Sequence, residues 1–320
     1  MTEDGRPGYA VTTLESWMAA ITHHYTAAGL DSPVRTRVVA ETMTGIRKQR
    51  TKAGIGPTKA APLLAHTLAA IVTAIDESAV GWKAQVAARR DTALLVIGFA
   101  AGLRRSELVA LWVSDIARAG DPGDRFLLVR IRGSKKSPTE MEYVAMARGE
   151  NPRTCPWCAV LRWLAVLAAF DRAVARATAR AHPDPAAAGQ HAVERVCARD
   201  TAPADVHVCE RAWPSFQAVD VALLRPLDAD GLPHLKALTR PAVVPDILKR
   251  RAAQAGFDAP VVETLKGHSA RGGAATMALA AGVSINDVAK HLRHRDIRTT
   301  RGYDRSQPWA GNTAADHLGL

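Results

Sequence analysis

Apolar residues recur at helical spacing through the first quarter of the chain. The stretch TTLESWMAAITHHYTAAGL places Leu14, Met18 and Ile21 on one face of a predicted helix. Thr12 and Glu15 in this stretch have the spacing of a capping box, which favours a helix start at Thr12. A second helix is predicted from about residue 35 into GIRKQRTKAG, where its later half becomes strongly basic. A third apolar pattern follows in APLLAHTLAAIVTAID. We therefore predict a helical first domain over residues 1–80.

The remaining residues, 81–320, are predicted to form a second domain with a mixed pattern. WKAQVAARRDTALLVIGFAAGLRRSELVALWVSDI indicates two helices that are separated near Gly102. In DRFLLVRIRGSKKSPTEMEYVAMA, short β-prone runs flank a turn-forming segment, which predicts a hairpin or a small three-stranded sheet. A long helix is expected from Pro156 to about Ala181. The Ala-, Pro- and Asp-rich residues 182–235 predict an insertion with partial order, after which helical pattern returns. The fold class is thus mainly α with a small β-sheet, in two domains.

The composition and net charge of the chain indicate what kind of partner it binds. The chain has 320 residues, a formal net charge of +11 and a pI of about 9.9, which favours a polyanion such as nucleic acid. No apolar run reaches membrane-spanning length, and the first residues lack a secretion signal. Only four cysteines occur, which is typical of a reducing compartment. We expect a cytoplasmic, nucleoid-associated protein with no membrane partner.

Two of the cysteines form the sequence CPWC. Cys155 and Cys158 could supply half of a zinc site. The other half would have to come from His207, Cys209 or Cys197, which lack the tight pairing of structural zinc ligands. Because Pro156 also fits the first turn of a helix, the pair has an ordinary structural explanation. We therefore predict no cofactor and favour no metal, with zinc at this pair as the alternative.

A set of basic and nucleophilic side chains has the composition that DNA strand cleavage needs. Cleavage without a metal requires a nucleophile, fixed cations on the phosphate oxygens and a proton for the departing 5′-hydroxyl. Arginine suits the phosphate because its planar fork donates two hydrogen bonds at once. Tyrosine is a feasible nucleophile, since the phenol is a good leaving group when the covalent link is reversed. The candidates are Arg104, Lys135, His268, Arg271, His294 and Tyr303.

The segments that carry these residues resemble the boxes of the tyrosine recombinases, also called the phage integrase family. GLRRSELVALWVSDI, IRGSKKSP, HSARGG and HLRHRDIRTTRGYDR occur in the order of that family and cover most of residues 85–320. The resemblance implies a two-domain clamp, in which a helical core-binding domain and a mixed α/β catalytic domain close around duplex DNA. It also implies one more helix at the front of the first domain than the pattern gives.

The resemblance implies a role for each matched residue. Tyr303 would attack a phosphate and form a 3′-phosphotyrosyl link, while Arg104 and Arg271 hold the non-bridging oxygens. His268 would assist proton movement from Tyr303, His294 would hydrogen-bond the phosphate, and Lys135 would protonate the leaving hydroxyl. Arg105 and Lys136 are alternative occupants of the Arg104 and Lys135 roles. Glu107 would support the site from behind.

The implied partners are double-stranded DNA recombination sites, three further copies of the chain in a tetramer on DNA, and an accessory DNA-bending protein. The C-terminal segment GNTAADHLGL resembles the family segment that docks on a neighbouring protomer. One departure is Arg293, which stands where the family usually has Gly. The predicted DNA contacts are Arg47, Lys48, Arg50, Lys52, Arg105, Lys136 and Arg293.

Three alternatives remain open from the sequence. AAGVSINDVAKHLR has the pattern of a helix-turn-helix DNA reader, with Asn286 and Lys290 on its second helix. That interpretation leaves Arg104, Lys135 and Tyr303 without a role, so we favour the recombinase. A catalytically inactive DNA-binding regulator of the same fold is the second alternative. The third is a type IB topoisomerase-like enzyme, which would relax supercoils without a partner strand.

Overall fold

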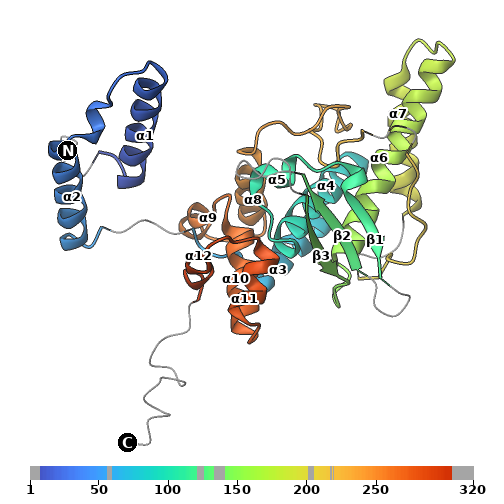
Figure 1. The fold of residues 1–320 in the computed structure, drawn as a ribbon. Coiled ribbons are helices and arrows are strands. Elements are labelled where there is room, and N and C mark those ends of the chain that lie inside the picture. The colour runs from blue at the N-terminus through green and yellow to red at the C-terminus, as the bar shows by residue number, and fades with distance from the viewer. Residues whose placement is uncertain are drawn as a thin grey trace, which may run out of the picture. The chain divides into compact units, whose positions relative to one another are not determined.

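The chain forms two units that are each described by themselves. The computed structural model describes residues 8–55, 60–120, 126–132, 141–200, 205–216, 218 and 220–304. The contacts divide the chain into Met1–Lys59 and Ala60–Leu320. Figure 1 shows the elements of both units with their labels.

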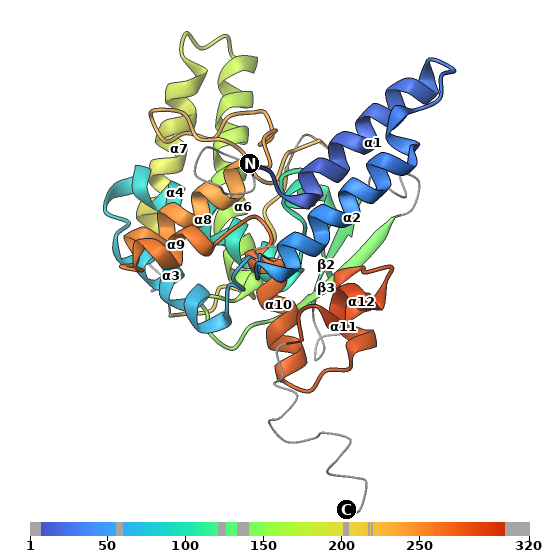
Figure 2. The same ribbon diagram turned by 90° about the vertical axis from the view of Figure 1, so that its left-hand side faces the viewer.

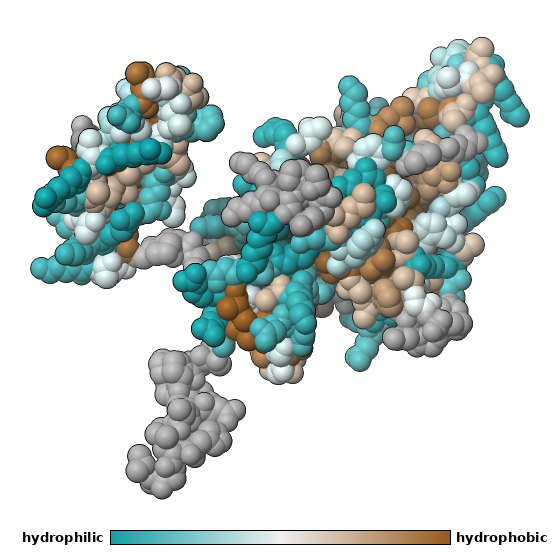
Figure 3. All heavy atoms as spheres, in the orientation of Figure 1, coloured by the Kyte–Doolittle hydropathy of each residue, from teal (hydrophilic) through white to brown (hydrophobic). Residues whose placement is uncertain are grey.

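The first unit is a pair of helices with little buried surface. It contains α1 (Val11–Ala27), a short 3₁₀ turn (Pro33–Arg35) and α2 (Arg37–Lys52). Of the described residues in these helices, only Met43 is buried, and Trp17 and Ile21 of α1 remain more than 40 % exposed. The space-filling view accordingly shows apolar side chains scattered among hydrophilic ones on this unit (Figure 3).

The predicted capping box at Thr12 is wrong. The helix begins at Val11, and Ala10 occupies the N-cap position without a side-chain cap. Thr12 lies inside the first turn, where its carbonyl oxygen accepts a hydrogen bond from Ser16 Oγ at 2.8 Å. The spacing therefore matched a capping box whose first residue is already helical.

The division between the units falls well before the predicted boundary at residue 80. Helix α3 (Ala65–Glu77) buries Leu68, Ile71, Val72 and Ile75 and packs against helices of the second unit. Leu63 just before it is completely buried, and its N–H donates to Ser269 O at 2.9 Å. The sequence predicted three consecutive helices, and periodicity does not show which of them pack together, so the pattern alone did not separate α3 from α1 and α2.

The core of the second unit forms around two long helices. They are α4 (Gly81–Ala100) and α6 (Pro156–Ala179), and the second half of α4 is buried almost all round. Trp163 of α6 is completely buried and its indole N–H donates to Leu223 O at 2.6 Å. The break that was predicted near Gly102 is confirmed, because α5 (Arg105–Val109) follows it.

The predicted small sheet is also confirmed. Strands β1 (Ile116–Ala119), β2 (Phe126–Ile131) and β3 (Glu142–Ala147) form an antiparallel sheet in the order β1-β2-β3. Val129 on the central strand pairs with Ile116 on one side and with Val144 on the other. All three are buried, so the sheet packs one apolar face on the core.

The insertion is more ordered than its composition predicts. It contains α7 (Pro185–Arg199), which packs along α6 and buries Val193. Further on, Leu223 and Leu224 are completely buried, and the Leu223 N–H donates to Leu111 O at 2.9 Å. The segment thus supplies part of the core. Its Ala- and Pro-rich composition obscured one helix and one short apolar run.

The chain then returns to helices that build the opposite end of the second unit. These are α8 (Val243–Gln254), α9 (Ala259–Thr264), α10 (Ser269–Ala280), α11 (Ile285–Leu292) and α12 (Ile297–Arg301). Asp91 of α4 is completely buried and accepts a hydrogen bond from Arg251 of α8 at 2.8 Å, which ties α8 to the core. Figure 2 shows α10, α11 and α12 grouped together below the level of α4 and α8. The fold is mainly helical with one small sheet, and no helix in the described parts of the chain is both long and apolar enough to cross a membrane.

Gly273 provides a test of how α10 docks. A Cβ added at Gly273 would lie 1.7 Å from the carbonyl oxygen of Leu63, and backbone cannot yield as a flexible side chain can. We predict that Gly273→Ala lowers the free energy of unfolding by about 3 kcal/mol or more, as expected for severe overpacking. Urea denaturation of the purified protein measures this change.

Gly45→Ala is the matched control. Gly45 lies inside α2, and nothing is within 4 Å of its added Cβ. This substitution should raise the stability of the first unit by about 0.5–1 kcal/mol through helix propensity. Equal small effects of the two substitutions would contradict the close packing of α10 against Leu63.

Candidate active site

The turn between α4 and α5 begins the candidate site. Gly102 has φ +54°, a left-handed conformation that favours glycine. A Cβ at this position would lie 2.3 Å from Leu292 Cδ2, so the turn also needs glycine to let the end of α11 approach. This turn delivers Arg104 to the N-cap position of α5 and brings it toward α10–α12.

Glu107 joins two arginines. Its carboxylate accepts hydrogen bonds from the Arg104 backbone N–H at 2.8 Å and from the Arg104 guanidinium at 2.5 Å. It also accepts one from Arg293 at 2.6 Å. Desolvation alone would raise the pKa of Glu107, but the charge of Arg293 and the hydrogen bonds from Arg104 outweigh it and hold that pKa below its usual range. Glu107 therefore remains an anion that fixes Arg104.

Arg293 does not lie where a DNA contact would. It caps the end of α11 at φ +55°, the left-handed conformation that a glycine would adopt there without strain. Its side chain is only 5 % exposed and lies between Glu107 and Glu142, 3.4 Å from the latter. The structure therefore does not support the predicted phosphate contact from Arg293, because the Arg293 guanidinium is already paired with carboxylates inside the protein.

Arg271 connects three parts of the site. It lies in the first turn of α10 and is 2 % exposed. Its guanidinium donates to Gly102 O at 2.5 Å and to Leu292 O at the end of α11. Burial, followed by the charges of Arg104 and Arg293, lowers the pKa of Arg271 to about 10, so it stays cationic at neutral pH. Two carbonyls hold the group in place, and a guanidinium has further N–H donors for an anion.

Tyr303 lies in the turn directly after α12 and is half-buried. Its ring stacks on His294, with ring centroids 5.9 Å apart and planes 9° apart. On another side it lies against Gly272 of α10, where an added Cβ would be 3.2 Å from the ring. Thr276 Oγ1 donates to the Tyr303 carbonyl at 3.4 Å. Glycine beside Arg271 thus leaves the space that the tyrosine ring occupies.

His294 and His268 are the two imidazoles of the site. His294 Nδ1 is hydrogen-bonded to the buried Thr300 Oγ1 at 2.9 Å. Burial, with the charges of Arg271 and Arg104, lowers the pKa of His294 to about 4, which keeps it neutral at pH 7. His268 occupies the N-cap of α10, and partial burial, with the nearby charge of Arg105, also lowers its pKa.

The remaining predicted residues are placed as follows. Lys135 and Lys136 lie outside the described residues, in the connection between β2 and β3. The first residue of β3, Glu142, contacts Arg293, so the base of that connection adjoins the site. Arg105 is exposed, and its side chain lies over Gly267 next to His268.

The predicted DNA contacts of the first unit all lie in the second half of α2. Arg47 pairs with Glu15 of α1 at 2.7 Å, and Arg50 donates to the carbonyl of Tyr9. Lys48 and Lys52 are exposed. Two of the four basic side chains therefore also hold α2 to the segment that contains α1.

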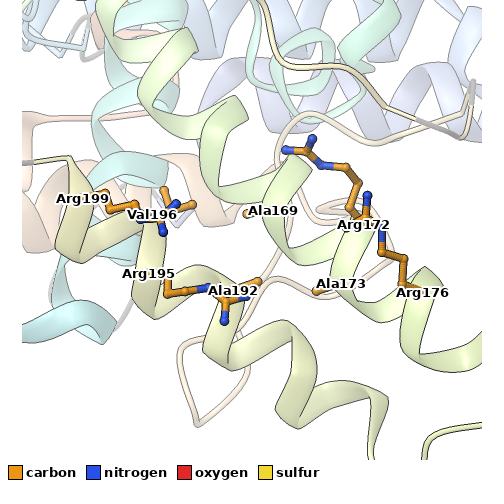
Figure 4. A pocket seen from close by; sticks show the side chains of 8 residues that line it. All are labelled: Ala169, Arg172, Ala173, Arg176, Ala192, Arg195, Val196 and Arg199. Atoms are coloured by element: carbon orange, nitrogen blue, oxygen red, sulfur yellow. The ribbon is translucent and has the colours of Figure 1, made fainter. Parts of the chain in front are cut away.

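One cationic feature was not predicted. A hollow of about 330 Å³ between α6 and α7 is lined by four exposed arginines: Arg172, Arg176, Arg195 and Arg199 (Figure 4). Each helix contributes a pair four residues apart, which places both members on one face. That repeated spacing was the available signal, and the chemistry of the hollow suits an anion with several oxygens.

Metal ligands gather elsewhere. Among the described residues, one group of His, Cys, Asp or Glu side chains is close enough to hold a metal ion. It consists of Cys155, Cys158, His207 and Cys209, at the start of α6 and outside the site around Tyr303.

Comparison with known proteins gives similarity only at the level of structure. No protein-family model and no curated protein sequence matches the chain. A XerH site-specific recombinase bound to difH substrate in a pre-cleavage complex is 18 % identical over 77 % of this chain, with a TM-score of 0.43. XerA recombinase is 15 % identical over 97 % of this chain and 76 % of its own length, with a TM-score of 0.40. The Tn1549 transposon integrase in complex with circular intermediate DNA is 15 % identical over 98 % of this chain and 80 % of its own length, with a TM-score of 0.43.

This chain spans 50 % of the length of that XerH chain. All three are described as recombinases or integrases, the class whose sequence boxes this chain resembles. Because identity and TM-score are low, we base the proposed function on the residues of this chain.

Removing the charge of Glu107 should weaken the site and the fold together. We predict that Glu107→Gln lowers the free energy of unfolding by about 2–3 kcal/mol, because Arg293 is then left buried with a weaker partner. Chemical denaturation measures this change. In the control Glu263→Gln, the carboxylate is 75 % exposed and paired with Lys249, and the change should stay within about 0.5 kcal/mol. Similar losses in both variants would refute the buried role of Glu107.

The lowered pKa of His294 predicts a dependence of stability on pH. In the unfolded chain the pKa of this histidine has its ordinary value of 6.5, whereas in the folded chain the pKa is about 4. Stability is therefore lost as pH falls from 6.5 toward 4. Since the imidazole is only half-buried, we expect a loss of about 1 kcal/mol rather than the full effect of the shift.

The measurement compares the wild type with His294→Gln between pH 4 and pH 7. His268 and His291 also have lowered pKa values, and the difference between the two proteins isolates His294. Parallel stability curves for the two proteins would contradict a half-buried, neutral His294.

Proposed function

We propose that this chain is a site-specific DNA recombinase that cuts and rejoins DNA strands through Tyr303. The observation that carries the proposal is the position of the Tyr303 ring, between the neutral imidazole of His294 and the α10 turn that holds Arg271. A phenol, a buried fixed guanidinium and a hydrogen-bonded imidazole at one place are the groups needed to attack a phosphate.

The proposed reaction is a displacement at phosphorus. The Tyr303 oxygen bonds to phosphorus and the bond to the 5′-oxygen of the next nucleotide breaks, which leaves a 3′-phosphotyrosyl link. The phenolic proton passes to His268, and the departing 5′-oxygen takes a proton from Lys135. When the 5′-hydroxyl of a partner strand attacks the link, these transfers reverse and the tyrosine is released. The covalent link conserves the energy of the broken bond, so no cofactor is needed.

The electrostatic roles follow from the contacts. Arg104 is held by Glu107, yet its side chain is 38 % exposed, so it can still reach a non-bridging oxygen. Arg271 keeps donors that the two carbonyls do not use. His294 is neutral, so with Nδ1 facing Thr300 its Nε2–H can donate to the phosphate. Donors fixed before the substrate arrives typically contribute a factor of about 10²–10³ each.

Lys135 and the partners remain part of the proposal. The contact of Glu142 with Arg293 supports a catalytic role for Lys135, because Lys135 belongs to the connection that leads into β3, and Glu142 is the first residue of β3. The proposed partners are duplex DNA recombination sites and three further copies of the chain, with DNA phosphates contacted by the exposed Lys48, Lys52 and Arg105. An inactive regulator and a topoisomerase-like enzyme are the outcomes against which the proposal is tested.

Covalent trapping in cells tests the chemistry and the nucleophile together. We expect DNA to remain attached to the wild-type protein after lysis in denaturant, and Tyr303→Phe to reduce that DNA by at least about a thousandfold. Tyr143→Phe is the matched control, because it removes the hydroxyl of an exposed tyrosine on β3 and should retain the link.

Sequencing the attached DNA separates the alternatives. DNA concentrated at one or two sites supports a site-specific recombinase, whereas scattered DNA with relaxed plasmids supports a topoisomerase. DNA on neither protein refutes the proposed activity and leaves the regulator. DNA on both the wild type and Tyr303→Phe refutes Tyr303 as the nucleophile.

A further inference from the structure

Three cysteines and a histidine meet at the start of α6. Cys155 is the N-cap residue of this helix and Cys158 lies in its first turn. His207 and Cys209 come from the segment that follows α7, about fifty residues later in the chain. The three cysteines are buried to 2 % exposure or less, and His207 is half-buried. Folding therefore brings His207 and Cys209 to the two cysteines of the CPWC sequence.

Four of the six distances between the four ligand atoms match a tetrahedron around one ion. Cys158 Sγ lies 3.4 Å from both Cys209 Sγ and His207 Nδ1. Cys209 Sγ lies 3.5 Å from His207 Nδ1 and 3.6 Å from Cys155 Sγ. All four atoms lie within 4.8 Å of one another. Zinc bonds of about 2.3 Å to sulfur and 2.0 Å to nitrogen give tetrahedral edges of about 3.5–3.8 Å, close to these separations.

The surrounding backbone orients the ligands. His207 Nε2 is 3.0 Å from the carbonyl oxygen of Glu150, to which it donates, and this contact leaves Nδ1 free to face the sulfur atoms. The Val208 N–H donates to Cys158 Sγ at 3.3 Å. Gly149 lies against Cys155, where an added Cβ would be 3.0 Å from the Cys155 Cα. A carbonyl partner for the second imidazole nitrogen and an N–H donor to a sulfur are typical of metal ligands.

We propose that Cys155, Cys158, His207 and Cys209 bind one structural zinc ion. Three thiolates and one imidazole fill the four positions of tetrahedral zinc, which leaves no open position for a substrate and makes the site structural. The sequence alone did not favour zinc, because the second pair, His207-x-Cys209, does not have the usual spacing of paired zinc ligands.

A disulfide explains the geometry less well. The closest sulfur atoms are 3.4 Å apart, whereas a disulfide bond is about 2.05 Å long. One disulfide would also leave the third thiol and the His207 imidazole directed at the same point without a function. Zinc uses all four groups.

The neighbouring cation fits the charge of such a site. A zinc ion with three thiolates carries a net charge of −1, which is costly to bury without compensation. The Arg118 guanidinium donates to the Cys209 carbonyl at 2.8 Å and lies over the ring of Trp157, 5.5 Å from its centroid. A second aromatic ring, that of Trp213, lies 5.4 Å from the same guanidinium. Arg118 therefore places a fixed positive charge next to the ligands.

The zinc ion would anchor the insertion. One ligand pair belongs to α6 and the other follows α7, so the ion joins the two ends of the α6–α7 hairpin. Further along, the insertion pairs with the core again where Leu223 donates to Leu111. This role does not depend on strand cleavage at Tyr303.

Metal analysis of the full-length protein tests the site. After purification from zinc-supplemented cells under reducing conditions, we expect one zinc ion per chain in the wild type. Cys209→Ser should lose the zinc, whereas Cys197→Ser should retain it. Cys197 is the matched control because it is also buried, but its sulfur contacts the Trp82 carbonyl at 3.9 Å and lies outside the ligand set.

Cobalt substitution and a ligand exchange keep the test decisive if Cys209→Ser does not fold. Co²⁺ added to the metal-free wild type should produce the absorption bands of tetrahedral coordination together with thiolate-to-cobalt charge transfer. His207→Cys, which keeps four ligands, should retain zinc, and His207→Ala should bind it at least about tenfold more weakly.

The proposal is overturned by either of two results. One is a reduced wild-type protein that takes up neither zinc nor cobalt. The other is a pair of these cysteines joined as a disulfide in the freshly purified protein, seen as the loss of two hydrogens by mass spectrometry. Neither result bears on the covalent trapping of DNA by Tyr303, so the two proposals fail independently.

Discussion

The fixed guanidinium of Arg271 is the interaction on which the site depends. It joins the α4–α5 turn to the end of α11 through the carbonyl oxygens of Gly102 and Leu292. These two residues also touch directly, since the Leu292 side chain leaves no room for a Cβ at Gly102. This connection helps to fix the helices that bring His294 and Tyr303 relative to Arg104. A buried cation thus serves as a structural tie while it keeps donors for an anion.

Glu107 performs the complementary task with a negative charge. It fixes Arg104 on its exposed side and Arg293 on its buried side. A non-glycine residue in a left-handed conformation costs roughly 1–2 kcal/mol, and Arg293 accepts that cost at the end of α11. The ion pair with Glu107 offsets it. An arginine at this turn therefore replaces the backbone freedom of a glycine with an additional ion pair between α11 and α5.

Much of the fold could be predicted from periodicity, because it reports which face of a helix is buried. The pattern predicted α4, α5, the small sheet and α6 close to where they occur. It could not assign α3 to a unit, since Leu63 and α3 meet partners such as Ser269 that are two hundred residues away. The core residues of the insertion were not predicted, for a similar reason. Leu223 and Leu224 form too short a run to stand out, and only pairing with Leu111 makes them core residues.

The candidate site shows the same limit at the level of side chains. The sequence named Arg104, His268, Arg271, His294 and Tyr303 by residue type and order, and the structure brings their elements together at one end of the second unit. It could not show that Arg293 turns inward, because that direction is set by Glu107 and Glu142 on other elements. The cysteine cluster extends this point. Cys155 and Cys158 were visible as a pair, but only the return of the chain after α7 brings His207 and Cys209 to them. Local spacing identifies groups that act together within one element, whereas ligands and ion pairs that join distant segments become evident only when the tertiary contacts are known.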